Sequence, residues 1–464
     1  QEIKKALEKE KELNQARSNF VSTISHEFRT PLAVILSSVQ LLEKYNEKWS
    51  VNKKESLFNK IYNPNNTWAT AFNVFPVDSG YVSCGVTGDS IYNKTNIIVS
   101  KYDANGNLIF FKEFKKDSSN CFAGGFSGGG FAKCKSGGYI LAGGIENSHF
   151  TDFLIRLNPN FDTIWTKQLY KDTIFSCVYN CIETSNQNFV ICGKRYFQES
   201  GGLTKVLLYK TDSMGNKLFE KYYDIILGAK GNRWDAGWNI TETPDKGFLL
   251  GCYTYDNAYQ GTGDGIVIKT DSLGNLAWMK NFGGPEKDAG LVTAVCNDGN
   301  YIVASSRAYY TADYNDYWSG KIRLTKIDTD GYIIWMKEYF GVIKGMSVTK
   351  IVQLSNGDFI FSGAKNHDAD TTHVYDYMDS YLFKVNSNGD SIWCKEYLYP
   401  VIGSSQVAWN TIFNLELTPE SGIVACGEIF YNTILPNNIW IFRTNEFGCL
   451  IPGCDLGVNE KSKK

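Results

Sequence analysis

The chain has 464 residues and a formal net charge of −2, from 47 Lys and Arg against 49 Asp and Glu. This balance gives no electrostatic reason to expect nucleic acid as a partner, and no apolar run approaches the ~20 residues of a membrane-spanning helix. Aromatic residues make up 14% of the chain, and 43 glycines stand against 10 prolines. This composition favours many short strands joined by tight turns.

The first 48 residues differ from everything that follows them. Gln1 to Arg17 is rich in Glu and Lys and poor in β-branched residues, which is typical of a solvated helix. A stripe of apolar residues then recurs in steps of seven and four, at Leu13, Phe20, Ile24, Pro31, Ile35 and Leu42. These steps match an a/d heptad seam, so the pattern predicts one long N-terminal α-helix that packs against a partner helix.

From about residue 73 a repeat of 57 to 59 residues appears. The clearest unit has an apolar strand ending in Gly, a second strand, an Asp/Asn-x-x-Gly turn and an aromatic-x-Lys-x-aromatic strand. In the second repeat, Asn160-Phe161 takes the place of the turn glycine. The turn glycines of the other repeats are Gly106, Gly215, Gly274, Gly331, Gly389 and Gly448. Seven repeats of this kind predict an all-β fold, a seven-bladed β-propeller over residues 55–455, followed by a disordered tail at 456–464.

The sequence also indicates how the ring of repeats closes. The seventh repeat stops after its turn at Gly448 and has no aromatic-x-Lys strand. Phe58-Asn-Lys-Ile-Tyr62, ahead of the first repeat, matches that missing strand. We therefore expect residues 58–62 to complete the last sheet and remove its open edge.

The segment Ser25-His-Glu-Phe-Arg-Thr-Pro-Leu32 carries groups suited to phosphoryl transfer. His26 lies off the apolar stripe, so an exposed imidazole nitrogen could accept a phosphoryl group. Glu27 could orient the other ring proton, and the hydroxyl of Thr30, one helical turn on, could orient a water. The alternative is that His26 is an exposed histidine on a charged helix, with no role in phosphoryl transfer.

Residues 10–48 resemble the phosphoacceptor helix of two-component sensor histidine kinases, and all eight residues of this segment fit the family's H-box. The resemblance implies His26 as phosphoacceptor, a homodimeric helix partner and a response regulator as possible partner. It makes residues 1–50 a partial dimerisation and phosphoacceptor segment of cytoplasmic type. The chain contains no recognisable ATP-binding domain, so we expect no self-phosphorylation, no bound cofactor and at best phosphorylation in trans.

Residues 57–454 resemble secreted β-propeller repeat proteins that Bacteroidota export by the type IX route. The segment from Asn445 to Cys454 resembles the linker that precedes their sorting domain, and Cys449 and Cys454 could close a local disulfide there. The resemblance implies a secreted or cell-surface protein that binds or scaffolds a peptide or carbohydrate ligand. Fold alone does not define that ligand.

Two loops inside the repeats hold further candidate residues. One places Asp368, Asp370, Asp376 and Asp379 close together, where they could bind Ca²⁺ or simply form a solvated loop. The Tyr-rich loop from Tyr309 to Trp318 could stack on sugar or peptide or could pack between blades. Neither a catalytic triad nor a zinc site is expected.

Three interpretations of the whole chain remain open. The first is a signalling protein in which a partial sensor histidine kinase is joined to a ligand-binding propeller. The second is an extracellular binding propeller with a foreign N-terminal segment and no catalytic activity. The third is an artificial join, because the string from Glu55 to Tyr62 fits both the kinase second helix and the closing propeller strand.

Overall fold

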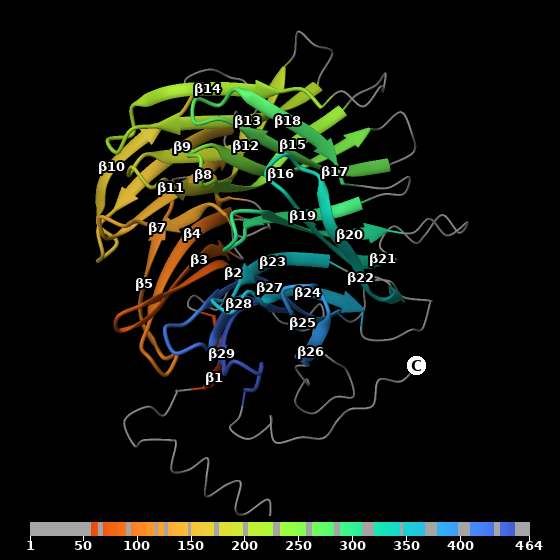
Figure 1. Cartoon of the computed structure of the whole chain (residues 1–464). Coiled ribbons are helices and arrows are strands. Elements are labelled where there is room, and N and C mark those ends of the chain that lie inside the picture. The colour runs from red at the N-terminus through yellow and green to blue at the C-terminus, as the bar shows by residue number, and fades with distance from the viewer. Residues whose placement is uncertain are drawn as a thin grey trace, which may run out of the picture. The chain divides into compact units, whose positions relative to one another are not determined.

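The protein is described by a computed structural model that divides into two compact units, Gln1–Ser56 and Leu57–Lys464. The described residues are 57–63, 68–89, 94–116, 119–124, 129–146, 150–170, 176–197, 203–225, 233–256, 262–282, 288–308, 320–343, 347–366, 378–397, 409–430 and 437–450. The expected N-terminal helix, the expected domain boundary near residue 50 and the expected tail at 456–464 lie outside them. Every regular element within these residues is a β-strand, which confirms the predicted all-β class (Figure 1).

The 29 strands form seven antiparallel groups, here called sheets 1 to 7. Sheet 1 consists of β2 (Ala69–Val77), β3 (Gly80–Asp89), β4 (Lys94–Tyr102) and β5 (Leu108–Phe114). Sheet 2 consists of β6 (Asn120–Ala123), β7 (Phe131–Lys133), β8 (Tyr139–Glu146), β9 (Phe150–Leu157) and β10 (Thr163–Gln168). Sheet 3 consists of β11 (Ser176–Glu183), β12 (Phe189–Phe197), β13 (Leu203–Thr211) and β14 (Lys217–Tyr223). Sheets 4 and 5 are β15 (Arg233–Glu242), β16 (Phe248–Asp256), β17 (Thr262–Thr270) and β18 (Leu276–Asn281); and β19 (Asp288–Val295), β20 (Tyr301–Ala308), β21 (Gly320–Ile327) and β22 (Ile333–Ile343). Sheets 6 and 7 are β23 (Ser347–Gln353), β24 (Phe359–Asn366), β25 (Met378–Val385) and β26 (Ser391–Tyr397); and β27 (Trp409–Leu417), β28 (Ile423–Phe430), β29 (Asn438–Thr444) and β1 (Phe58–Tyr62).

Two sheets depart from the four-strand pattern. In sheet 2 the first strand is interrupted: β6 and β7 both pair with β8, and residues 124–130 separate them in the sequence. A single parallel bridge between Thr204 and Trp234 joins sheets 3 and 4 into one eight-stranded hydrogen-bonded sheet. Because neighbouring strands are antiparallel, the turns between strands one and two and between strands three and four share one end of the sheets, the turn end. The remaining connections fall at the opposite end, the loop end.

The turn that follows strand three is built in the same way in all seven sheets. In sheet 3, Asp212 Oδ1 accepts the backbone N–H groups of Met214 at 2.9 Å and Asn216 at 2.8 Å, which is an Asx turn. The predicted turn glycines adopt left-handed backbone angles, with φ of +79° at Gly215. Phe161 adopts the same conformation at φ +65° with its ring fully buried, so the second repeat keeps the turn without glycine.

The aromatic-x-Lys strands connect each sheet to the next. Lys167 Nζ donates to Asn216 Oδ1 at 3.3 Å, and a Cβ on Gly215 would lie 2.9 Å from the Trp165 ring. A tyrosine at the end of the strand donates to the turn carbonyl of the following sheet, as Tyr223 does to Gly274 at 2.6 Å. The repeat motif is therefore used for packing between sheets.

The predicted closing strand is confirmed. β1 pairs antiparallel with β29, from Phe58 opposite Arg443 to Tyr62 opposite Ile439, although the two strands lie at opposite ends of the sequence (Figure 1). The Tyr62 hydroxyl donates to the carbonyl of Gly106, and the Phe58 ring lies against the same glycine. β1 thus contacts the turn glycine of sheet 1 through an aromatic ring and a tyrosine hydroxyl, as other fourth strands contact the turn glycine of the next sheet.

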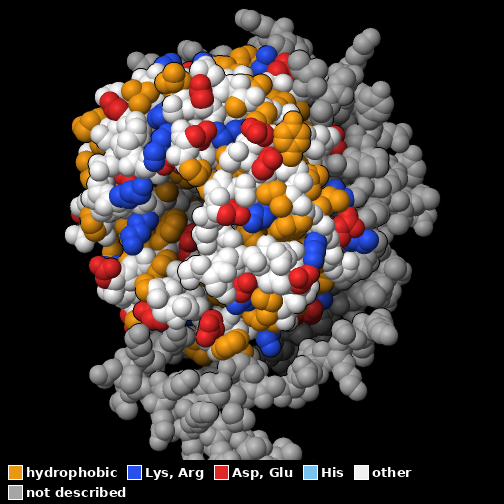
Figure 2. Space-filling model, viewed as in Figure 1, with side chains coloured by type: hydrophobic (Ala, Val, Ile, Leu, Met, Phe, Trp, Pro, Cys, Tyr) orange, Lys and Arg blue, Asp and Glu red, His pale blue; other side chains and the backbone are white. Residues whose placement is uncertain are grey.

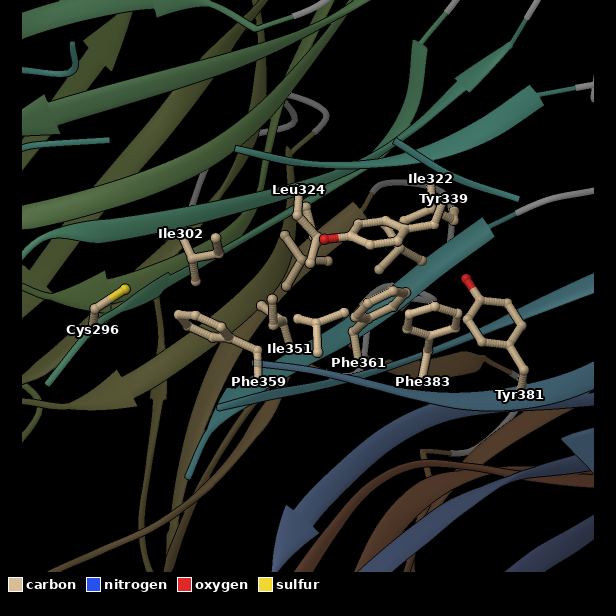
Figure 3. Close-up of a cluster of buried hydrophobic side chains, with 14 residues drawn as sticks. Cys296, Ile302, Ile322, Leu324, Tyr339, Ile351, Phe359, Phe361, Tyr381 and Phe383 are labelled. Atoms are coloured by element: carbon tan, nitrogen blue, oxygen red, sulfur yellow. The ribbon is translucent and has the colours of Figure 1, made fainter. Parts of the chain in front are cut away.

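Seven clusters of buried hydrophobic residues each draw their members from two consecutive sheets, and one of them joins sheet 7 to sheet 1. Figure 3 shows the cluster between sheets 5 and 6, where Phe361 and Phe383 stack with ring centroids 5.0 Å apart. Tyr339 from sheet 5 packs against both rings. Burying such a side chain contributes roughly 2–3 kcal/mol. The shared cores link the seven sheets into a closed circuit.

Candidate functional site

The first strands of the sheets contact one another in succession, from β7 through β11, β15, β19, β23 and β27 to β2. Most of them carry a β-bulge at the same place, because the pairing with the second strand skips one residue. A bulge re-aims the side chain of the unpaired residue. In four sheets that residue is aromatic: Phe72, Tyr179, Trp238 and Phe413.

The four bulge aromatics pack as two pairs across sheet boundaries. Phe72 and Phe413 meet edge to face at 5.3 Å, between sheets 1 and 7. Tyr179 and Trp238 stack at 4.5 Å with an interplanar angle of 17°, between sheets 3 and 4. The first pair is buried, whereas both rings of the second pair are half-buried. The Tyr179–Trp238 stack is therefore the one with surface left for contact.

A lysine and a second tryptophan extend this stack toward the loop end. Lys194 lies opposite Cys177 in the β11–β12 register, and its Nζ lies 4.7 Å from the ring centroid of Trp234 and 5.7 Å from that of Tyr179. Such cation–π contacts stabilise by about 0.5–2 kcal/mol. Trp234 is 43% exposed, more than any other tryptophan whose side chain is described. We call Tyr179, Lys194, Trp234 and Trp238 the indole cluster.

The electrostatics of the indole cluster favour binding over covalent chemistry. Burial lowers the pKa of Lys194, while the nearby Cys177 acts in the opposite direction. Burial raises the pKa of the Cys177 thiol to about 12 and also raises the pKa of the Tyr179 hydroxyl. Because thiolate and phenolate are the nucleophilic forms, neither group is activated near neutral pH.

A buried polar network lies beside the indole cluster at the boundary of sheets 2 and 3. Asp152 is 1% exposed, and burial raises its pKa to about 6, against the lowering effects of Ser176, the Val178 backbone and Arg195. Arg195 pairs with Glu220 at 3.0 Å and lies 4.1 Å above the Tyr170 ring. This network holds charge in the interior next to the candidate site.

Acidic and basic side chains are interspersed among hydrophobic ones on the face in Figure 2. The described residues contain no group of three or more His, Cys, Asp or Glu placed to hold a metal ion. Within the same residues, no helix has the length and apolar character needed to cross a membrane.

Most residues singled out from the sequence lie outside the described part. This holds for His26, Glu27 and Thr30, for the Tyr309–Trp318 loop and for three of the calcium candidates, Asp368, Asp370 and Asp376. Their roles stay predictions. The fourth carboxylate, Asp379, is 1% exposed on β25, so it belongs to a sheet. Cys449 is disulfide-bonded, while its expected partner Cys454 is not described.

The indole cluster was missed because its signal is spread over distant repeats. In each of the four bulges the aromatic residue is followed by asparagine, as in Phe72-Asn73 and Trp238-Asn239. The asparagine ties neighbouring sheets together: Asn239 Oδ1 accepts the N–H of Thr293 at 3.0 Å and its hydroxyl at 2.7 Å. A recurrent aromatic-Asn dipeptide could have located these positions.

Comparison with known proteins identifies the N-terminal part. The model of the His Kinase A (phospho-acceptor) domain matches residues 16–62. This segment is kinase-like. Two curated relatives from Dictyostelium discoideum are hybrid signal transduction histidine kinase G, 44% identical over 52 residues, and kinase E, 55% identical over 38 residues. These stretches cover 11% and 8% of this chain and only 2% of each relative. The last five residues of the family match form β1.

Solved structures resemble the strand-rich part. An ulvan lyase of polysaccharide lyase family PL25 has a TM-score of 0.51 at 8% identity, covering 86% of this chain and 97% of that chain. Polysaccharide lyase Uly1 has a TM-score of 0.50 at 9% identity, covering 86% and 94%. The β-propeller domain of the Trilobed protease from Pyrococcus furiosus has a TM-score of 0.42 at 9% identity, covering 82% and 95%. At these identities the likeness concerns the fold alone.

Proposed function

We propose that the chain is a partial sensor histidine kinase, in which a phosphoacceptor segment around His26 is joined to a ligand-binding seven-bladed β-propeller. The observation that carries the first half is the phospho-acceptor family match, which spans His26 and the whole H-box. His26 accepts a phosphoryl group from a kinase in trans, Glu27 orients the ring, and Thr30 positions the water that removes the phosphoryl group. A second copy of the segment and a response regulator are the proposed partners.

The propeller half of the proposal is supported by the closed circuit of seven sheets. Each sheet shares a core with its two neighbours, β1 completes sheet 7, and the first strands from β7 to β2 contact one another in succession. These are the features of seven blades around one axis. Propellers offer ligands the region where first strands and loops converge, and the indole cluster lies at that end. The proposed ligand is an extracellular peptide or carbohydrate.

Phosphotransfer assays test the kinase half. Full-length protein is incubated with radiolabelled ATP, alone and with an active histidine kinase, and acid-labile label on the chain is counted. We expect label only with the added kinase, and its loss in His26→Gln but not in His149→Gln. Label with ATP alone, or label that persists in His26→Gln, would contradict the proposal. Thr30→Ala is expected to prolong the lifetime of the phosphoryl group.

A second candidate is favoured by the closing strand. Residues 58–62 lie within the kinase match yet form β1, so the strand-rich unit takes its last strand from that match. This supports a secreted or cell-surface binding propeller of the type IX kind with a foreign N-terminal segment and no activity at His26. Limited proteolysis of the full chain before residue 57 distinguishes the two. A cleaved product that keeps a β-type far-UV spectrum and the unfolding midpoint of the full chain favours the second candidate, whereas unfolding on cleavage removes it.

A further inference from the structure

Trp234 presents a fixed aromatic surface at the loop end of sheets 3 and 4. It is the second residue of β15, and its backbone pairs with Thr204 in the bridge that joins the two sheets. The Thr204 hydroxyl donates to the carbonyl of Asp235 at 2.9 Å and holds the same segment. Lys194 covers one face of the indole, and 43% of the residue remains exposed. The indole is therefore held in place before any ligand arrives, which lowers the ordering cost of binding.

The surroundings of Trp234 favour a flat ring over an extended peptide. The Thr204–Trp234 bridge occupies the backbone edge beside the indole, so a peptide cannot add there as a further strand. The Tyr179–Trp238 stack lies further along the first strands β11 and β15 and adds to this aromatic surface. Aromatic faces backed by few polar groups are typical of small-ligand sites.

Lys194 adds a charge preference to this surface. Its ammonium lies within 6 Å of two aromatic rings and is half-buried, and burial lowers its pKa. An anionic group on the ligand would form a charge-assisted hydrogen bond with this ammonium, in addition to the contacts that the ammonium already makes.

We propose that Trp234 and Lys194 form a binding site for an acidic oligosaccharide, with one sugar ring against the exposed part of the indole and the carboxylate of a neighbouring sugar at the Lys194 ammonium. This inference rests on the proposed function of the propeller as a ligand-binding module. It adds the position of the site and the chemical class of the ligand. No bond is made or broken in this binding.

The chain contains a matched control for this site. Tyr332, immediately before β22, is 66% exposed, and Lys280 Nζ lies 3.7 Å from its ring centroid. This pair repeats the chemistry of an exposed ring covered by a lysine. It lies at the turn end next to a fourth strand, however, and lacks the stacked aromatic pair.

The test is calorimetric titration of the full chain with oligogalacturonate, with neutral cello-oligosaccharides and with an unbiased peptide library. We expect oligogalacturonate to bind, with affinity falling about 30-fold in Trp234→Ala, less in Trp234→Phe, and not at all in Tyr332→Ala. Lys194→Met should weaken oligogalacturonate about tenfold and leave any binding of neutral sugars unchanged. Unfolding midpoints of all variants confirm that the fold is retained.

The outcomes separate this inference from the proposed function. Oligogalacturonate binding that survives Trp234→Ala would overturn the site. Binding of neutral sugars alone, or equal weakening of neutral and acidic sugars by Lys194→Met, would overturn the charge preference. Peptide binding lost in Trp234→Ala, without sugar binding, would overturn the ligand class and leave the binding module standing. Binding of none of the three would overturn both.

Discussion

The closing contact between β1 and sheet 1 predicts a large and specific loss of stability in Phe58→Ala. Phe58 is 5% exposed, meets Tyr81 edge to face at 5.2 Å and covers Gly106. Removing a buried phenylalanine ring costs about 3–5 kcal/mol, because the apolar contacts are lost and a cavity remains. Since β1 is the outermost strand of sheet 7, we expect the lower end of this range.

Gly106 supplies a second variant that reports on the same contact. Its φ is +75°, and an added Cβ would lie 2.3 Å from the Phe58 ring. Gly106→Ala therefore carries both a left-handed strain of about 1–2 kcal/mol and a clash with Phe58. Phe58→Ala removes the atoms that clash. The loss in free energy of unfolding of the double variant should consequently be smaller than the sum of the two single losses, by about 1–2 kcal/mol.

Guanidinium denaturation followed by tryptophan fluorescence and far-UV circular dichroism measures both effects. Ile109→Ala is the control, because Ile109 is 55% exposed on β5 and its loss should stay within about 0.5 kcal/mol. Equal midpoints for wild type and Phe58→Ala would refute the assignment of residues 58–62 as the closing strand. Strict additivity in the double variant would refute the contact between Phe58 and Gly106.

Two further predictions concern buried charge and turn geometry. Burial raises the pKa of Asp152 to about 6 from 3.8, so the folded protein favours its protonated form, and stability from this group is lowest above pH 6 and rises as pH falls toward 4. Asp152→Asn should therefore raise the free energy of unfolding near neutral pH by at most about 3 kcal/mol, and this gain should fade in acid. A gain that grows in acid would contradict this. Gly215→Ala should destabilise the protein more than Gly299→Ala. Both glycines have φ near +80°, so the backbone strain is similar, but a Cβ at Gly215 would lie 2.7 Å from Lys167, whereas one at Gly299 would meet nothing within 4 Å. Equal midpoints for the two variants would show that backbone strain alone sets the cost.

The repeat geometry could be predicted from sequence because its signals are local. The Asp212 turn needs only an Asx side chain and a left-handed fourth residue, and both are visible within five residues. The closing strand could be predicted because Phe58, Lys60 and Tyr62 repeat the spacing of other fourth strands, such as Trp393, Lys395 and Tyr397 in β26. Even the turn without glycine at Phe161 was recognised from its place in the repeat.

The indole cluster depends on pairings that no local pattern contains. Lys194 and Trp234 come from different sheets, and their approach depends on the bulge register of β11 and β15. A shift of one residue in either strand would turn Tyr179 or Trp238 to the opposite face. The N-terminal half poses the reverse situation: the His26 motif was recognised from sequence, whereas its geometry lies outside the described residues.

The shared use of residues 58–62 has a practical consequence for dissecting the protein. The kinase family match ends at residue 62, so a cut at that boundary would seem to separate two modules cleanly. It would instead remove β1 and expose the backbone edge of β29. The hydrogen bond that the Trp440 indole donates to the Asn59 side chain, at 2.7 Å, would be lost. Such a fragment should aggregate through the unpaired strand, whereas one beginning at Leu57 should stay monodisperse.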